Sequence, residues 1–217
     1  MLRVAVVSLV YAAATAFGAE GTLKPVEALP AGVNEKIAAV LHKPGVQVQV
    51  DGKPVCTLWR VEQATAKEGF KSTLNVKYPF QPGQLLGVME VNQAKEFTDF
   101  RGQEVKPGVY TLRYGQQPVD GNHVGTSELY DFLVAIPAKS DADVAPPKSV
   151  DDLVKKSAAT TGSNHPAIFS LLPVDKADAT PTLTHDDGKE FWVVTSTLPV
   201  GAEKTIPIRL VVVGRSE

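Results

Sequence analysis

Cysteine is almost absent from this chain of 217 residues, which contains only Cys56. A single cysteine excludes a disulfide within the chain and a structural zinc site built from several thiolates. Cys56 lies in an apolar stretch with strand character, so we predict a buried small side chain and not a reactive thiol. A chain of this length does not need such cross-links, because it buries about 70% of its unfolded surface on folding.

A surplus of positive charge is also absent, since the net charge is −2 and no run of like charges occurs. This balance argues against a nucleic-acid partner, which requires many cations to neutralise phosphates, and against a charged membrane-surface patch. Several catalytic motifs are missing as well: G-x-S-x-G, G-x-G-x-x-G, the P-loop and C-x-x-C-H. The composition predicts no cofactor and no covalent chemistry.

The only long apolar run lies at the N-terminus. Met1-Leu2-Arg3 is a short positive start, Val4 to Phe17 is mainly apolar, and Ala14-Thr15-Ala16 resembles a cleavage site. This order is typical of a secretory signal, and the run is shorter than the roughly 20 residues of a membrane span. We therefore predict a signal peptide at 1–19, export to the periplasm or the extracellular space, and a mature chain without a membrane span.

After residue 45 the pattern is that of β-strands. Val46, Val48 and Val50 alternate with glutamines, which is the period of a strand with one buried face. Asp51-Gly52 is suited to the two positive-φ positions of a type I′ turn, and an apolar segment follows it. These residues predict a β-hairpin.

Further strands and two short helices complete the prediction. Asn34 and Ser149 are candidate N-caps, and Gly162 is a candidate end of the second helix, whereas 21–32 is a lead-in rich in proline and glycine. We predict one domain over 20–217, an all-β, mainly antiparallel β-sandwich of jelly-roll or immunoglobulin-like type with eight to ten strands and one or two short helices. The other candidate strands are 74–80, 85–91, 109–114, 128–136, 168–172, 182–184, 191–198 and 205–213.

Several sequence blocks occur together in one known group of proteins. They are D-G-K-P-V-C-T-L-W at 51–59, D-F-R-G-Q at 99–103, V-K-P-G-V-Y-T-L-R-Y-G at 105–115, P-V-D-G-N-H-V-G at 118–125, Y-D-F-L-V-A-I-P at 130–137 and T-G-S-N-H-P-A at 161–167. In these blocks the chain resembles an uncharacterised group of exported, β-rich bacterial proteins. The resemblance spans most of residues 30–173 and implies an exported β-rich protein, but no particular activity.

Two charged residues lie within otherwise apolar predicted strands. If the two strands pair, Asp131 lies opposite or diagonal to Arg113. A charge in such a strand needs a partner, because an isolated buried carboxylate is very costly. We expect an ion pair that fixes the register, and the alternative is an Arg/Asp couple that lines a ligand groove.

Two Asn-His dipeptides, Asn122-His123 and Asn164-His165, fall in predicted loops. If one end of the sandwich brings them together with Asp120, two histidines and a carboxylate form a ligand set for zinc or non-haem iron. The alternative is that both histidines only shape their own loops. Loops on a rigid β scaffold are also where ligand-binding residues concentrate.

These observations favour an exported binding or structural accessory protein whose partner is an unknown protein, small molecule or saccharide. One alternative is a metal-dependent or hydrolytic enzyme that uses the two Asn-His loops. Another is a carbohydrate-binding module, which requires an exposed aromatic row that includes Trp59 or Trp192. A tryptophan on a sheet face more often belongs to the core.

Overall fold

The computed structural model describes residues 20–92, 97–118 and 129–216. The predicted signal peptide and the residues Asp120, Asn122 and His123 lie outside this part. Within the described residues, ten strands form a seven-stranded sheet of order β1-β2-β3-β4-β5-β6-β7 and a three-stranded sheet of order β10-β9-β8. Every neighbouring pair is antiparallel, which confirms the all-β sandwich. The strands are β1 (Gly21–Val26), β2 (Gly45–Val50), β3 (Lys53–Arg60), β4 (Leu85–Val91), β5 (Gly108–Gln116), β6 (Asp131–Pro137), β7 (Ala167–Ser170), β8 (Thr182–Asp186), β9 (Phe191–Val200) and β10 (Lys204–Val213).

The predicted hairpin is present. β2 pairs with β3, and the two turn residues Asp51 and Gly52 have φ values of 49° and 73°. Positive φ at both central positions defines the type I′ turn, whose twist matches that of the strands it joins. Local sequence is therefore sufficient to specify this part of the sheet.

Two segments differ from the prediction. Residues 21–26, expected to be irregular, form the edge strand β1, and an edge position tolerates Pro25 because it requires fewer ladder donors. Residues 74–80, expected to be a strand, form no strand, and Leu74 is 83% exposed. There the backbone N–H of Lys77 donates to the Asp131 carboxylate at 2.5 Å and not to a neighbouring strand.

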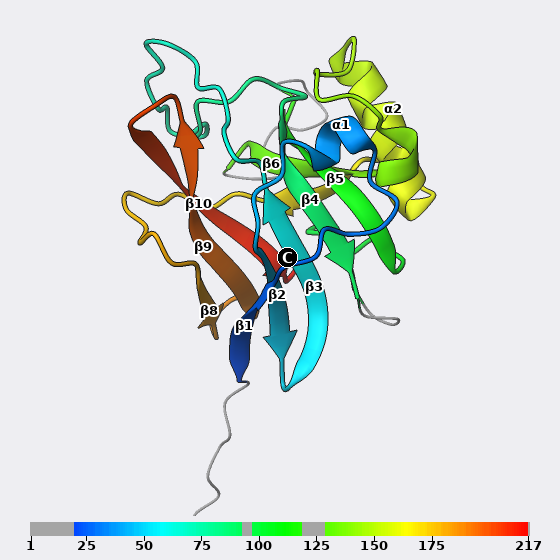
Figure 1. The fold of residues 1–217 in the computed structure, drawn as a ribbon, viewed down its shortest axis with the longest axis vertical. Helices are drawn as coiled ribbons and strands as arrows, with labels where there is room; N and C mark the ends of the chain where they lie inside the picture. The colour runs from blue at the N-terminus through cyan, green and yellow to red at the C-terminus, as the bar shows by residue number, and fades with distance from the viewer. Residues whose placement is uncertain (1–19, 93–96, 119–128, 217) are drawn as a thin grey trace, which may run out of the picture.

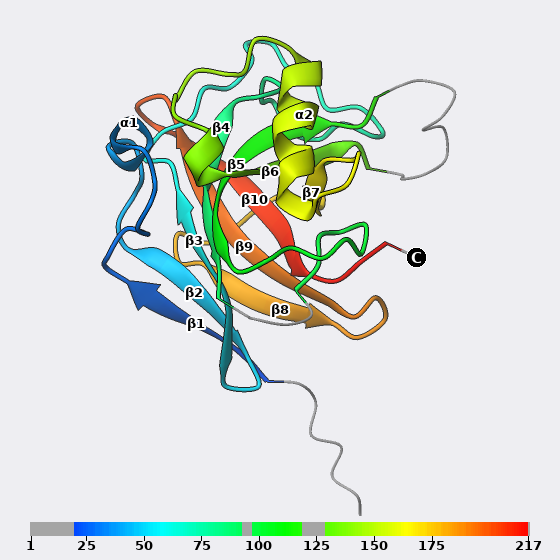
Figure 2. The same ribbon diagram turned by 90° about the vertical axis from the view of Figure 1, so that its right-hand side faces the viewer.

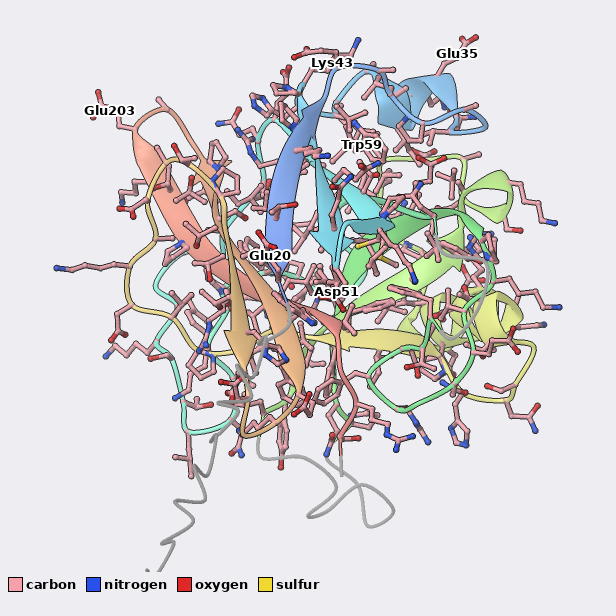
Figure 3. All side chains as sticks on the ribbon, turned by 90° about the horizontal axis from the view of Figure 1, so that it is seen from below. Glu20, Glu35, Lys43, Asp51, Trp59 and Glu203 are labelled. Atoms are coloured by element: carbon pink, nitrogen blue, oxygen red, sulfur yellow. The ribbon has the colours of Figure 1, made fainter. Side chains whose placement is uncertain are left out.

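The main core lies between the two sheets (Figure 1). Two isolated bridges also connect the sheets: Leu171, after β7, bridges to Leu210 of β10, and Ala64, after β3, bridges to Val200 of β9. Cys56 is buried, as predicted. Trp59 and Trp192 are buried too, so neither contributes to an exposed stacking surface. In Figure 3 Trp59 lies among the strands, whereas Glu35 and Glu203 point away from the body of the protein.

In the part of the chain that the structure describes, two α-helices and one 3₁₀ turn accompany the sheets: α1 (Glu35–Ala38), η1 (Ala138–Ser140) and α2 (Val150–Thr161). The predicted caps of α2 are present, since the Ser149 side chain accepts from the Asp152 N–H and Gly162 ends the helix at φ 70°. Figure 2 shows α2 lying over β6 and β7 on the outer side of the large sheet. None of the helices in the described residues is long and apolar enough to cross a bilayer.

Candidate functional site: a groove beside the second helix

The predicted pair of Arg113 and Asp131 does not form. β5 and β6 do pair, but the register places Asp131 opposite Gln116 and Arg113 opposite Val134. Because side chains alternate along a strand, Asp131 faces the space between the sheets and Arg113 faces the outer side. The prediction was wrong because strand pairing alone does not decide which residues share a face.

Arg113 instead pairs with Asp141, which follows η1. Its Nε donates to Asp141 Oδ2 at 2.6 Å and its Nη2 donates to Oδ1 at 3.0 Å. The remaining donors reach backbone carbonyls of Gly83, Asp143 and Ala145. Every donor of this buried guanidinium has an acceptor, so Arg113 fastens the segment after β6 to the sheet and presents no group to a ligand.

Asp131 is held in the core by a different set of groups. The Tyr114 hydroxyl donates to Asp131 Oδ1, and the Gln116 side chain donates to that hydroxyl at 2.8 Å. Burial raises the pKa of Asp131, and hydrogen bonds from Tyr114 and from the backbone of Lys77 and Tyr78 oppose that rise. Asp131 is fully buried, which makes it a structural residue and not part of an accessible site.

Asn164 and His165 lie in the loop that follows α2, and both are exposed. The structure describes neither Asp120 nor His123, so the predicted convergence of the two Asn-His loops stays a prediction. Among the described residues, no group of three or more His, Cys, Asp or Glu side chains is placed to hold a metal ion.

A groove of about 1050 Å³ runs beside α2 and includes Asn164 and His165 in its lining. Its floor is apolar and comes from β6 and β7, mainly Phe132, Val134 and Ile168. Val150 and Val154 of α2 form part of its wall. The size and the mixture of an apolar floor with a few polar groups are typical of a ligand-binding cleft.

Gly115 of β5 also lines this groove. A Cβ atom at this position would lie 2.5 Å from Val134 Cγ2, closer than side chains pack. Glycine at position 115 therefore leaves room for the Val134 side chain in the lining of the groove.

One end of the groove is built by a hydrogen-bonded cluster centred on Asp99, which we call the Asp99 clamp. The buried Asp99 carboxylate accepts from the backbone N–H groups of Arg101, Gln103 and Ile168 and from the Gln103 side chain, at 2.8 to 3.1 Å. Gln103 in turn donates to Pro166 O at 3.2 Å and accepts from Ser163 Oγ at 2.5 Å. The clamp joins the blocks D-F-R-G-Q and T-G-S-N-H-P, which are 58 positions apart at Gln103 and Thr161.

The clamp brings the backbone at Arg101 close to the 163–168 segment, and Arg101, Asn164 and His165 all line the groove. The Arg101 side chain is exposed, and within the described residues its guanidinium has no ion pair or hydrogen bond. The end of the groove thus carries an unpaired positive charge and two polar side chains above an apolar floor.

No family model, curated protein or solved structure matches this chain. Sequence reasoning singled out Asn164 and His165 but not Arg101, Asp99 or Gln103. The blocks D-F-R-G-Q and T-G-S-N-H-P are recognisable in the sequence, but their contact depends on how β7 and the 97–103 segment pack, which no local spacing reveals.

Proposed function

We propose that this protein is an exported binding protein that acts without covalent chemistry and holds its ligand in the groove beside α2. The single observation that carries the proposal is the groove itself, which combines a volume of about 1050 Å³ with an apolar floor and polar groups at one end. The buried ionisable residues Arg113, Asp131 and Asp141 all have structural partners, so they leave no reactive pair at the groove.

Val150 supports the assignment because it is an apolar side chain left 50% exposed on the wall of the groove. A ligand on the floor covers this valine, and removal of apolar surface from water favours binding. Val144 is 37% exposed and does not line the groove, so it provides a matched control.

The test is a fluorescence titration with N-phenyl-1-naphthylamine, an apolar and uncharged probe. We expect saturable binding of one probe per chain and an affinity about tenfold lower for Val150→Asp, which corresponds to about 1.4 kcal/mol. Aspartate is tolerated in the first turn of a helix, so the variant retains α2. Val144→Asp binds as the unchanged protein does. If the two substitutions change the affinity for the probe equally, or if binding is not saturable, the groove is not the binding site.

The proposal of export rests on the N-terminal sequence pattern. Its test is N-terminal sequencing of the mature protein recovered from the periplasm or the medium. A first residue between 17 and 20 is expected, and a protein retained in the cytosol with Met1 intact contradicts export.

A further inference from the structure

We infer that the ligand of the groove is an amphiphilic carboxylate, with its apolar chain on the floor and its carboxylate beside Arg101. This inference rests on the proposed function and adds the chemical class of the ligand. It is carried by the exposed guanidinium of Arg101, which has no ion pair within the described residues and lines the same groove as a continuous set of apolar side chains.

The apolar part of the groove favours a ligand with an extended apolar chain. The floor continues from Phe132 through Val134 to Ile168, and Val150 and Val154 extend it along the wall. These side chains come from three separate elements, β6, β7 and α2, so the surface is a built feature of the fold and not a single exposed residue. A compact polar ligand leaves most of this surface in water.

The charge of Arg101 determines which polar group of a ligand is favoured. Arg101 carries a planar guanidinium with parallel donors, which matches the two oxygens of a carboxylate. The backbone N–H of Arg101 donates a hydrogen bond to Asp99 Oδ1 at 3.0 Å, and this bond fixes the position of the Arg101 Cα atom. Asn164 and His165, which line the same groove, add further hydrogen-bonding groups.

Among the described residues that line the groove, Asp151 carries the carboxylate, and it lies in the first turn of α2. The polar residues Asn164 and His165 follow the other end of that helix, and the rise from residue 151 to residue 161 is about 15 Å. This length exceeds the screening length of about 8 Å at physiological ionic strength, and among the described residues Asp151 forms no ion pair with Arg101. A cation at the same end of the ligand meets repulsion from Arg101.

The experiment compares decanoate, decanol and decyltrimethylammonium by titration calorimetry below their micellar concentrations. We expect decanoate to bind about tenfold more tightly than decanol and decyltrimethylammonium to bind most weakly. Arg101→Gln lowers the affinity for decanoate about tenfold and leaves decanol unchanged. Arg101→Lys retains part of the preference, because lysine keeps the charge but lacks the paired donors. Lys155→Gln removes an exposed charge of α2 outside the groove and is expected to have no effect.

The two proposals fail in different ways. Equal affinities for decanoate and decanol, with no effect of Arg101→Gln, overturn the carboxylate inference and leave the groove as an apolar binding site. If none of the three amphiphiles and no uncharged probe binds, both proposals are overturned. Because Arg101 is exposed and unpaired in the described structure, circular dichroism and the unfolding midpoint of its variants are expected to match the unchanged protein.

Discussion

Arg113 on β5 forms a two-pronged ion pair with Asp141, whereas Asp131 on the neighbouring strand lies on the opposite face of the sheet. The pair holds the chain after η1 against the outer side of the sheet. Thr111, two residues before Arg113, donates its hydroxyl to Asp141 Oδ2 at 2.5 Å and completes the arrangement. A segment without regular structure is thus anchored by one fully bonded guanidinium.

This relationship predicts selective coupling in a double-mutant cycle. Arg113→Met and Asp141→Asn are each expected to lower the free energy of unfolding by about 3–5 kcal/mol, because each leaves polar groups buried without a partner. The double variant loses less than the sum of the two, whereas Arg113→Met with Asp131→Asn is additive. Urea unfolding measures all of these values, and a coupling between Arg113 and Asp131 as large as that with Asp141 would contradict the structure.

Asp131 predicts a pH-dependent stability. Burial raises its pKa, so the folded protein binds this proton more readily than the unfolded chain does. The contribution to stability is fully present below the ordinary aspartate pKa of about 3.9 and is lost as the pH rises through the raised value. Above about pH 4 we expect Asp131→Asn to gain stability relative to the unchanged protein as the pH rises through the raised pKa of Asp131.

Urea unfolding at a series of pH values gives this comparison. Asp178→Asn, at an exposed position, is the control and should follow the unchanged protein at every pH. A constant difference between Asp131→Asn and the unchanged protein over the whole range would show that Asp131 does not titrate in this way.

The Asp99 clamp predicts a coupled loss of stability and binding. Asp99→Ala leaves the backbone donors of Arg101, Gln103 and Ile168 without their acceptor, and we expect a cost of about 2–4 kcal/mol. The same variant should weaken binding of the naphthylamine probe, because Ile168 of the apolar floor loses the acceptor of its backbone N–H.

Asp178→Ala again serves as the control and is expected to change stability by less than about 0.5 kcal/mol. Unfolding by urea and the probe titration are measured on the same preparations. If Asp99→Ala matches this control in both measurements, the clamp does not hold the end of the groove.

Local elements were predictable because their causes are local. The turn at Asp51-Gly52, the caps Ser149 and Gly162 of α2 and the alternation in β2 depend on residues within a few positions of one another. Residues 74–80 had a strand-like composition, but Asp131 takes the donor of Lys77, and Asp131 is 54 positions away. Likewise, the proline-containing residues 21–26 became a strand only because β2 offered them an edge.

The sequence by itself determined the period-two burial, the hairpin, the capped helix and the burial of Cys56, since backbone sterics and hydrophobic patterning act over short distances. Only the tertiary structure decided that Arg113 meets Asp141, that Asp99 gathers two distant blocks, and that a groove opens beside α2. These features depend on register and on which face of a sheet a segment crosses. A shift of one residue in the pairing register moves every side chain of a strand to the opposite face of the sheet. No local sequence pattern determines the register between strands that are far apart in the chain.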